Sequence, residues 1–274
     1  MASSFVHVTH HGKDMRVVIL ENPDQVSSRA ADIFCQLIAS KPDCVLGLAT
    51  GGTPLGTYQE LVSRHRAGQV SFSAVTSFNL DEYVGLPPSH PQSYSHFMHQ
   101  ELFDQTDFST DRCHLPNSSA TDLLAACDEY EQLINAAGGI DLQLLGIGGD
   151  GHIAFNEPGS SLASRTRLKA LTERTRNDNA RFFDSLEEVP KLSMTMGVGS
   201  ILDARRILLL ATGTNKANVI KALVEGPITA SVPASALQLH PQVTVLVDRH
   251  AASGLSRVDY YQEVERIQYS LENA

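Results

Sequence analysis

Short apolar segments alternate with helix-like segments along most of the chain, and this order constrains the fold more than any other feature of the sequence. In the helix-like segments, apolar residues recur every three or four positions, as on one face of a helix. Such alternation is typical of a mainly parallel sheet with helices on both faces. The expected strands cover residues 16–20, 44–49, 75–79, 142–145, 166–171, 206–211 and 243–247. The expected helices cover residues 26–38, 54–66, 93–103, 121–137 and 216–224.

The predicted fold class is α/β, with a single Rossmann-like open sheet that is mainly parallel and has helices on both faces. A chain of 274 residues can bury a large core, and no linker-like stretch divides this one. Residues 1–14 are polar and carry three scattered histidines. We therefore expect a flexible N-terminal extension over residues 1–14 and one domain over residues 15–274.

The composition of the chain argues against nucleic acid and membranes as partners. The formal net charge is −10, from 21 basic and 31 acidic residues, and no block of Lys and Arg stands out. Binding to nucleic acid is not expected, because neutralising phosphates needs clustered cations. Apolar runs have strand length and the N-terminus lacks the apolar core of a signal peptide, so no membrane partner is expected either. The four cysteines show no metal-ligand spacing and indicate reduced thiols in a cytoplasmic protein.

Glycine-containing turns follow two of the expected strands. They read Ala-Thr-Gly-Gly-Thr-Pro at 49–54 and Thr-Gly-Thr-Asn-Lys at 212–216. Glycine lets backbone N–H groups approach an anion, and the N-terminus of the following helix adds positive potential. Lys216 is unfavourable near a helix N-terminus unless an anion offsets its charge. Each turn alone is also compatible with an ordinary strand-to-helix connection, but the two together favour a phosphorylated ligand.

The expected strand at 142–145 leads into Gly-Ile-Gly-Gly-Asp-Gly-His-Ile-Ala-Phe-Asn-Glu-Pro at 146–158. This loop places Asp150, His152 and Glu157 close together in the sequence. Histidine has a proton affinity near neutrality, and flanking carboxylates can fix its tautomer and raise its basicity. The glycines also match a dinucleotide fingerprint, but Pro158 and Gly159 interrupt the helix which that motif requires. The loop indicates acid/base chemistry, with a structural, hydrogen-bonded histidine as the alternative.

A third loop, Asn-Leu-Asp-Glu-Tyr-Val-Gly at 79–85, follows the expected strand at 75–79. At the carboxyl edge of the sheet, one of the adjacent acids can face a cleft while the other points away. Asp81, partly desolvated there, could remove a proton from carbon. The alternative is that these acids cap a helix or turn.

The loops at 50–54, 78–83 and 150–158, with the segments at 161–167 and 237–241, resemble glucosamine-6-phosphate deaminases. The resemblance runs from about Met15 to at least Asp248 and leaves out the first 14 residues. It implies an enzyme that converts glucosamine 6-phosphate and water into fructose 6-phosphate and ammonia, without a metal or organic cofactor. The implied catalytic residues are Asp81, Asp150, His152 and Glu157. The implied phosphate-binding residues are Gly51, Gly52, Thr53, Arg181 and Lys216.

Within the implied reaction, His152 would shuttle the ring-opening proton, with Asp150 and Glu157 orienting and charging it, and Asp81 would abstract the carbon 2 proton. Two alternatives remain. A 6-phosphogluconolactonase-like hydrolase would not require Asp81 as a carbon base. A sugar-phosphate sensor without turnover would keep the glycine turns and lose the acid/base set, which is complete here.

The resemblance also implies regulation. Activated family members are hexamers that bind N-acetylglucosamine 6-phosphate at a subunit interface, through residues matching Ser160, Ser161, Arg167 and Lys169. Two departures weaken this inference: Ala170 stands where a Thr is expected, and the family's chain start aligns near Met15. We expect a homo-oligomer, by resemblance a hexamer, with weaker activation than in fully matching members. A solvated Ser-rich turn before a basic strand edge is the alternative.

Overall fold

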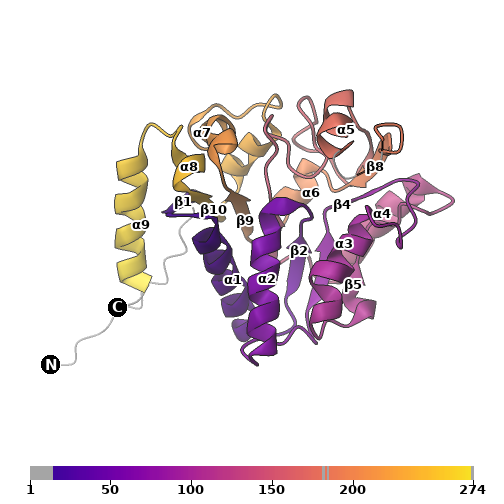
Figure 1. Ribbon diagram of the computed structural model, residues 1–274, viewed down its shortest axis with the longest axis horizontal. Coiled ribbons are helices and arrows are strands. Elements are labelled where there is room, and N and C mark those ends of the chain that lie inside the picture. The colour runs from indigo at the N-terminus through magenta and orange to yellow at the C-terminus, as the bar shows by residue number, and fades with distance from the viewer. Residues whose placement is uncertain (1–14, 181–182, 184, 273–274) are drawn as a thin grey trace.

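Seven parallel strands form the main sheet of the protein, seen here in a computed structural model that describes residues 15–180, 183 and 185–272 (Figure 1). The strand order is β1-β10-β9-β6-β2-β3-β5. Their bounds are β1 Met15–Leu20, β2 Val45–Leu48, β3 Thr76–Asn79, β5 Cys113–His114, β6 Leu142–Leu145, β9 Ile207–Ala211 and β10 Val243–Asp248. Every pairing in this sheet is parallel, which confirms the predicted fold class.

A second sheet of three antiparallel strands lies beyond the main one, in the order β4-β8-β7. It contains β4 Asp81–Tyr83, β7 Arg167–Ala170 and β8 Leu192–Thr195. The expectation that residues 81–83 form a loop was wrong, because they pair with β8. The segment expected at 166–171 is a strand, but it belongs to this smaller sheet. Neither β4 nor β8 shows the apolar run that identifies a buried parallel strand.

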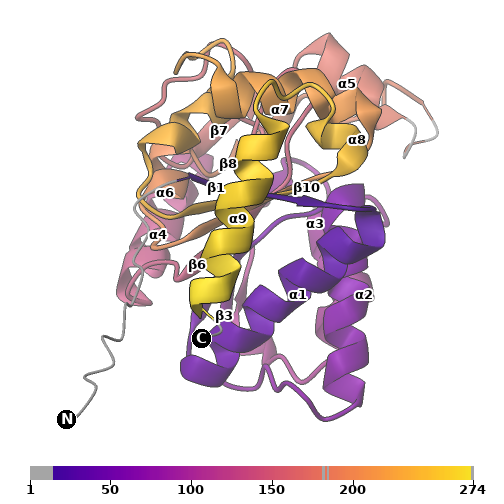
Figure 2. The same ribbon diagram turned by 90° about the vertical axis from the view of Figure 1, so that its left-hand side faces the viewer.

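Helices flank the main sheet. Figure 2 shows α1 and α2 side by side on one flank, with α4 and α6 on the other. The predicted helices are confirmed, with shifted ends, as α1 Pro23–Ser40, α2 Gly52–Arg66, α3 Tyr94–Glu101, α4 Leu123–Ala136 and α7 Ala217–Glu225. The remaining helices are α5 Glu173–Ala180, α6 Val198–Leu202, α8 Arg249–Ala252 and α9 Val258–Glu272. Short 3-10 segments are η1 Phe103–Gln105, η2 Thr110–Arg112, η3 Thr214–Lys216 and η4 Pro233–Leu239.

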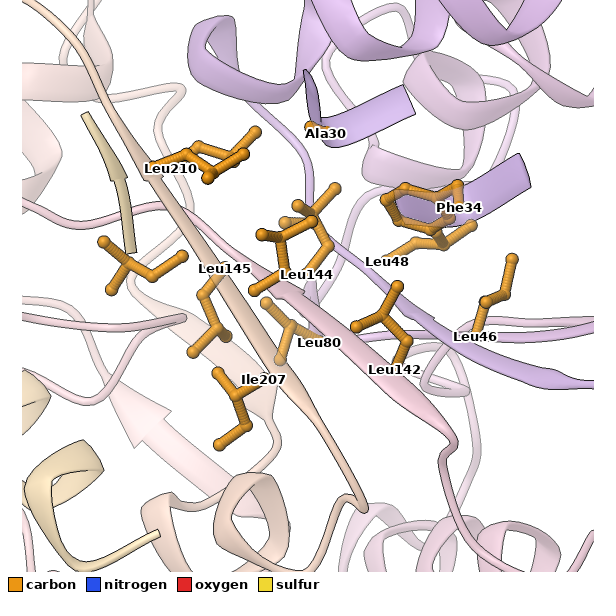
Figure 3. Packing of buried hydrophobic residues seen from close by; sticks show 14 of the residues in the cluster. Ala30, Phe34, Leu46, Leu48, Leu80, Leu142, Leu144, Leu145, Ile207 and Leu210 are labelled. Atoms are coloured by element: carbon orange, nitrogen blue, oxygen red, sulfur yellow. The ribbon is translucent and has the colours of Figure 1, made fainter. Parts of the chain in front are cut away.

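The core lies where α1 packs against the middle strands of the main sheet. Phe34 of α1 is fully buried and lies beside Leu46 and Leu48 of β2 (Figure 3). Leu142 and Leu144 of β6 continue this apolar layer. Strands covered on both faces are apolar at nearly every position, and such strands are the ones that the sequence pattern identifies.

Tyr58 of α2 fixes the carboxyl end of β2, from which the first glycine turn departs. Its side chain is fully buried. The Tyr58 hydroxyl donates to the Ala49 carbonyl at 2.6 Å and accepts from the Ala49 N–H at 3.2 Å. One side chain thereby pairs both backbone groups of the first residue of the turn.

Replacing Tyr58 with Phe should lower the free energy of unfolding by about 1–3 kcal/mol, because two buried backbone groups of Ala49 lose their partner. Urea titration followed by circular dichroism measures this change. The matched control is Tyr260→Phe, since Tyr260 is 58% exposed and its replacement should change stability by less than about 0.5 kcal/mol. Equal stability of the two variants would contradict the assigned role of Tyr58.

Candidate functional site

A cavity of about 650 Å³ opens at the carboxyl edge of the main sheet. Open parallel sheets bind their ligands at this edge, because the loops after neighbouring strands converge there. The cavity is lined by the turn after β2, the start of β4, the loop before α3, the loop after β6 and the turn after β9. The three loops singled out from the sequence therefore meet at one place, together with the turn at 212–216.

Asp150 and His152 form a hydrogen-bonded pair on one side of the cavity. The Asp150 Oδ1 lies 2.7 Å from His152 Nδ1 and also accepts from the His152 N–H at 3.2 Å. The hydrogen bond from His152 holds the pKa of Asp150 well below its usual value, even though burial opposes this shift. An ionised Asp150 can only accept, so Nδ1 carries the proton and Nε2 is left to exchange a proton with a ligand.

Gly148 makes room for the imidazole ring of His152. A Cβ atom at position 148 would lie 2.1 Å from the Cε1 atom of His152, which is far inside contact distance. The Gly148 N–H also donates to the His152 carbonyl at 2.9 Å. Glycine is therefore required here by close approach, which explains one of the glycines that resemble a dinucleotide motif.

Glu157 is buried, with 4% of its surface exposed. Its Oε1 accepts from the Thr172 N–H at 3.2 Å and from the Thr172 hydroxyl at 2.7 Å. The acid that contacts the His152 ring by a described hydrogen bond is Asp150. An effect of Glu157 on the charge of His152 stays a prediction.

Asp81 lies on another wall of the cavity, at the start of β4 and opposite Thr195 of β8. Its side chain is 6% exposed. Burial raises the pKa of Asp81 to about 8, and the neighbouring Glu82 adds to this shift. A carboxyl with such a pKa holds its proton at neutral pH in most molecules and is a strong base once it is ionised.

Glu82 points away from the cavity, as the alternation along a strand requires. Its Oε1 accepts from the N–H groups of Tyr83 at 2.8 Å and Tyr94 at 3.0 Å. Its Oε2 accepts from the Ser95 N–H at 2.8 Å. The two adjacent acids therefore divide as the sequence suggested, with one toward the cavity and one toward α3.

The predicted phosphate-binding residues Gly51, Gly52 and Thr53 line the cavity at the first turn of α2. Gly51 has a φ of 101°, which favours glycine, and no side chain caps this helix start. The uncapped N–H groups and the helix dipole favour an anion here. Lys216 reaches the same cavity, and its Nζ donates to the Ile147 carbonyl at 2.6 Å. Arg181 lies outside the described residues.

An aromatic wall of the cavity was not predicted from the sequence. Tyr83, Tyr94 and Phe155 line it, and the Tyr94 and Phe155 rings stack with centroids 5.9 Å apart. The Tyr83 and Tyr94 centroids are 4.9 Å apart. Asn215 of η3 is a further polar lining residue that was missed. The three aromatic rings come together through the pairing of β4 and the docking of α3, and no local sequence pattern signals either event.

The residues of the predicted allosteric set lie apart from this cavity, in the loop after Pro158 and on β7. Ser160 is buried, and its hydroxyl has no hydrogen-bond partner among the described residues. Arg167 donates to the Asn156 Oδ1 at 2.8 Å, and burial lowers the pKa of its guanidinium. Ser161 is exposed and Lys169 is half-buried.

Among the residues that the structure describes, no cluster of three or more His, Cys, Asp or Glu side chains is arranged to hold a metal ion. No helix in the same residues is both long and apolar enough to span a membrane.

Comparisons with known proteins agree with this geometry. Residues 21–246 match the family model for glucosamine-6-phosphate isomerases and 6-phosphogluconolactonase. A glucosamine-6-phosphate deaminase of Shewanella woodyi is 55% identical over 251 residues, which are 92% of this chain and 95% of that protein. One of an Arthrobacter species is 55% identical over 248 residues, covering 90% of this chain and 95% of the relative.

Solved structures give the same picture at the level of the fold. A monomeric glucosamine-6-phosphate deaminase superimposes with a TM-score of 0.86 at 49% identity, covering 88% of this chain and all of that one. A 6-phosphogluconolactonase of Trypanosoma brucei shares the fold, with a TM-score of 0.73 at 20% identity over 89% of this chain and 99% of that one. The chain thus belongs to the family of glucosamine-6-phosphate isomerases and 6-phosphogluconolactonases.

Proposed function

We propose that this protein is a glucosamine-6-phosphate deaminase, which converts glucosamine 6-phosphate and water into fructose 6-phosphate and ammonia. The observation that carries the proposal is the placement of a buried carboxyl, Asp81, and the Asp150–His152 pair around one cavity. An anion site at the start of α2 lies beside them. The match with the relatives named for this activity covers more than nine tenths of the length of each relative.

Binding comes first in the proposed mechanism. The phosphate of the sugar binds to the N–H groups at Gly51, Gly52 and Thr53, with Lys216 and Arg181 as charged partners. Phosphate is held far from the reacting carbons, so its binding energy serves to orient the sugar. The proposed mechanism assigns no role to a metal or an organic cofactor.

Ring opening requires a proton to leave the hydroxyl on carbon 1 and another to reach the ring oxygen. His152 Nε2 takes the proton from the hydroxyl and gives one to the ring oxygen, because Nδ1 is hydrogen-bonded to Asp150. Asp150 stabilises the charged imidazole during this transfer. We propose that Glu157 adds negative charge near this pair.

Isomerisation follows. Ionised Asp81 removes the proton from carbon 2 while the aldehyde oxygen on carbon 1 gains a proton, which gives an enolamine. A proton returned to carbon 1, with loss of one from nitrogen, converts the enolamine into an imine at carbon 2. Water then hydrolyses the imine to the ketone and releases ammonia. A base with a pKa of about 8 suits this step, because proton transfer is most effective when the pKa lies near the working pH.

The purified protein should release ammonia and fructose 6-phosphate in equal amounts from glucosamine 6-phosphate. Replacing Asp81 with Asn should lower kcat by about 10²- to 10⁴-fold, since it removes the base and keeps the shape. The matched control is Asp111→Asn, which changes an exposed aspartate that does not line the cavity and should retain full activity.

The proposal fails if folded wild-type protein binds the sugar phosphate and releases no ammonia. Hydrolysis of 6-phosphogluconolactone by the wild type, undiminished in Asp81→Asn, would instead support the lactonase alternative. Binding without either reaction would support a sensor.

We further propose a cytoplasmic location and a domain over residues 15–274 preceded by an N-terminal extension. We also propose a homohexamer that N-acetylglucosamine 6-phosphate activates weakly through Ser160, Ser161, Arg167 and Lys169. The buried Ser160 hydroxyl, which has no hydrogen-bond partner among the described residues, and the Arg167 guanidinium, which lies 2.8 Å from Asn156, are chemically suited to a phosphorylated ligand. The similar solved deaminase is described as monomeric, so the assembly needs a direct measurement.

Light scattering should give the mass of six chains, and the effector should lower the substrate concentration at half-saturation. Removing residues 1–14 should strengthen activation if the extension obstructs the effector pocket. A single-chain mass, with a hyperbolic curve that the effector leaves unchanged in both forms, would refute the regulatory proposal and leave the catalytic one intact.

A further inference from the structure

We propose that Glu82 is a positioning residue for the proposed reaction, because its charged carboxylate joins the strand of the base Asp81 to the first turn of α3. The inference rests on the proposed function and assigns a role to the acid beside the base. Glu82 does not line the cavity, so it acts through the groups that it holds and through its charge.

The contacts of Glu82 complete the hydrogen bonding at the start of α3. Tyr94 and Ser95, the first two helical residues, donate their N–H groups to opposite oxygens of Glu82. The third N–H, that of His96, goes to the Ser93 hydroxyl at 3.0 Å. The first N–H groups of a helix have no intrahelical partners, so the start of α3 needs acceptors from elsewhere. Glu82 supplies two of them, and hydrogen bonds to a charged carboxylate are strong.

The helix start that Glu82 holds is also a wall of the cavity. Residues 91–94 and Phe97 line it, and the Tyr94 ring contacts both Tyr83 of β4 and Phe155. Glu82 also accepts from the Tyr83 N–H within its own strand. One carboxylate therefore links the strand of Asp81 to the part of the aromatic wall that α3 supplies, and a shift of α3 would change the shape of the cavity around the sugar.

The charge of Glu82 acts directly on Asp81. Burial raises the pKa of Glu82, but three backbone N–H donors oppose this shift, whereas Asp81 lacks such described donors. When two adjacent carboxyls compete, the better hydrogen-bonded one keeps the charge and raises the proton affinity of the other. Glu82 is therefore the ionised member of the pair.

Besides Glu82, three buried tyrosines feel the charge of Asp81, and His152 and Lys216 line the same cavity. Tyr83 lies on the same strand, Tyr94 on α3 and Tyr130 on α4, and burial raises the pKa of all three above the usual value for tyrosine. They stay neutral in the working pH range. The paired strand β8 places only Thr195, Met194 and Ser193 opposite β4.

Glu82→Gln tests the inference, because it removes the negative charge. It also replaces one accepting oxygen with an NH₂ group, which cannot accept from a backbone N–H. The ascending limb of kcat/KM against pH should move to lower pH by about 0.5–1 unit. KM should also rise about three- to tenfold as the α3 wall loosens. The matched control is Glu101→Gln at the other end of α3, which should behave as the wild type. Substrate ionisation is common to all variants and cancels in the comparison.

Glu82→Asp separates charge from reach and serves if Glu82→Gln folds poorly. The ascending limb of kcat/KM against pH should stay at its wild-type position, because the charge is retained. KM should rise, because the shorter side chain cannot reach the N–H groups of α3. Wild-type turnover is measured first, since its absence refutes the proposed function and not this inference. If the wild type turns over, Glu82→Gln could lower thermal stability while it leaves KM and the ascending limb of kcat/KM against pH unchanged. That result would show that Glu82 is a purely structural cap, and it would overturn the proposal. An unmoved limb would then belong to another group, such as His152.

Discussion

The antiparallel pairing of β4 with β8 is the constraint on which the site depends. The chain leaves the parallel sheet after Asn79 and enters this pairing at Asp81, opposite Thr195. Alternation along the strand then turns Asp81 toward the cavity and Glu82 toward α3. A slip of one residue in the register would exchange the two acids, so the pairing, and not the residue type, decides which acid faces the cavity.

Backbone hydrogen bonds hold this register from both sides. The Leu80 N–H donates to the Leu48 carbonyl, and the Met196 N–H donates to the Leu80 carbonyl at 2.7 Å. Leu80 thereby joins the main sheet to the small one, immediately before Asp81. The buried position of Asp81 follows from this junction, and its raised pKa follows mainly from burial.

The parallel sheet could be predicted from the sequence because its strands are buried on both faces. Ile207–Ala211, for example, is apolar at every position and almost fully buried. The Asp150–His152 pair was also predictable, because the two residues lie two positions apart in a loop after such a strand. The turn at 49–54, which we propose binds phosphate, could be located from its glycines and from the helix behind it.

The rest depends on contacts between distant segments. β4 carries two acids and β8 is short and mixed in polarity, so neither resembles a buried strand. The aromatic wall exists only after α3 docks on Glu82, which lies 12 residues before Tyr94. For the same reason, sequence alone did not reveal that the described hydrogen bonds of Glu157 go to Thr172.

In the proposed reaction, the Asp81 carboxyl presented by β4 removes a proton from carbon 2 of the sugar. Proton NMR of glucosamine 6-phosphate in deuterated water tests it most directly, because the carbon 2 proton signal reports that single step. We expect the wild-type protein to remove this signal, and we expect the signal to persist with a folded Asp81→Asn variant that still binds the sugar phosphate. Loss of the signal at the wild-type rate in that variant would contradict the role of Asp81 and require another base.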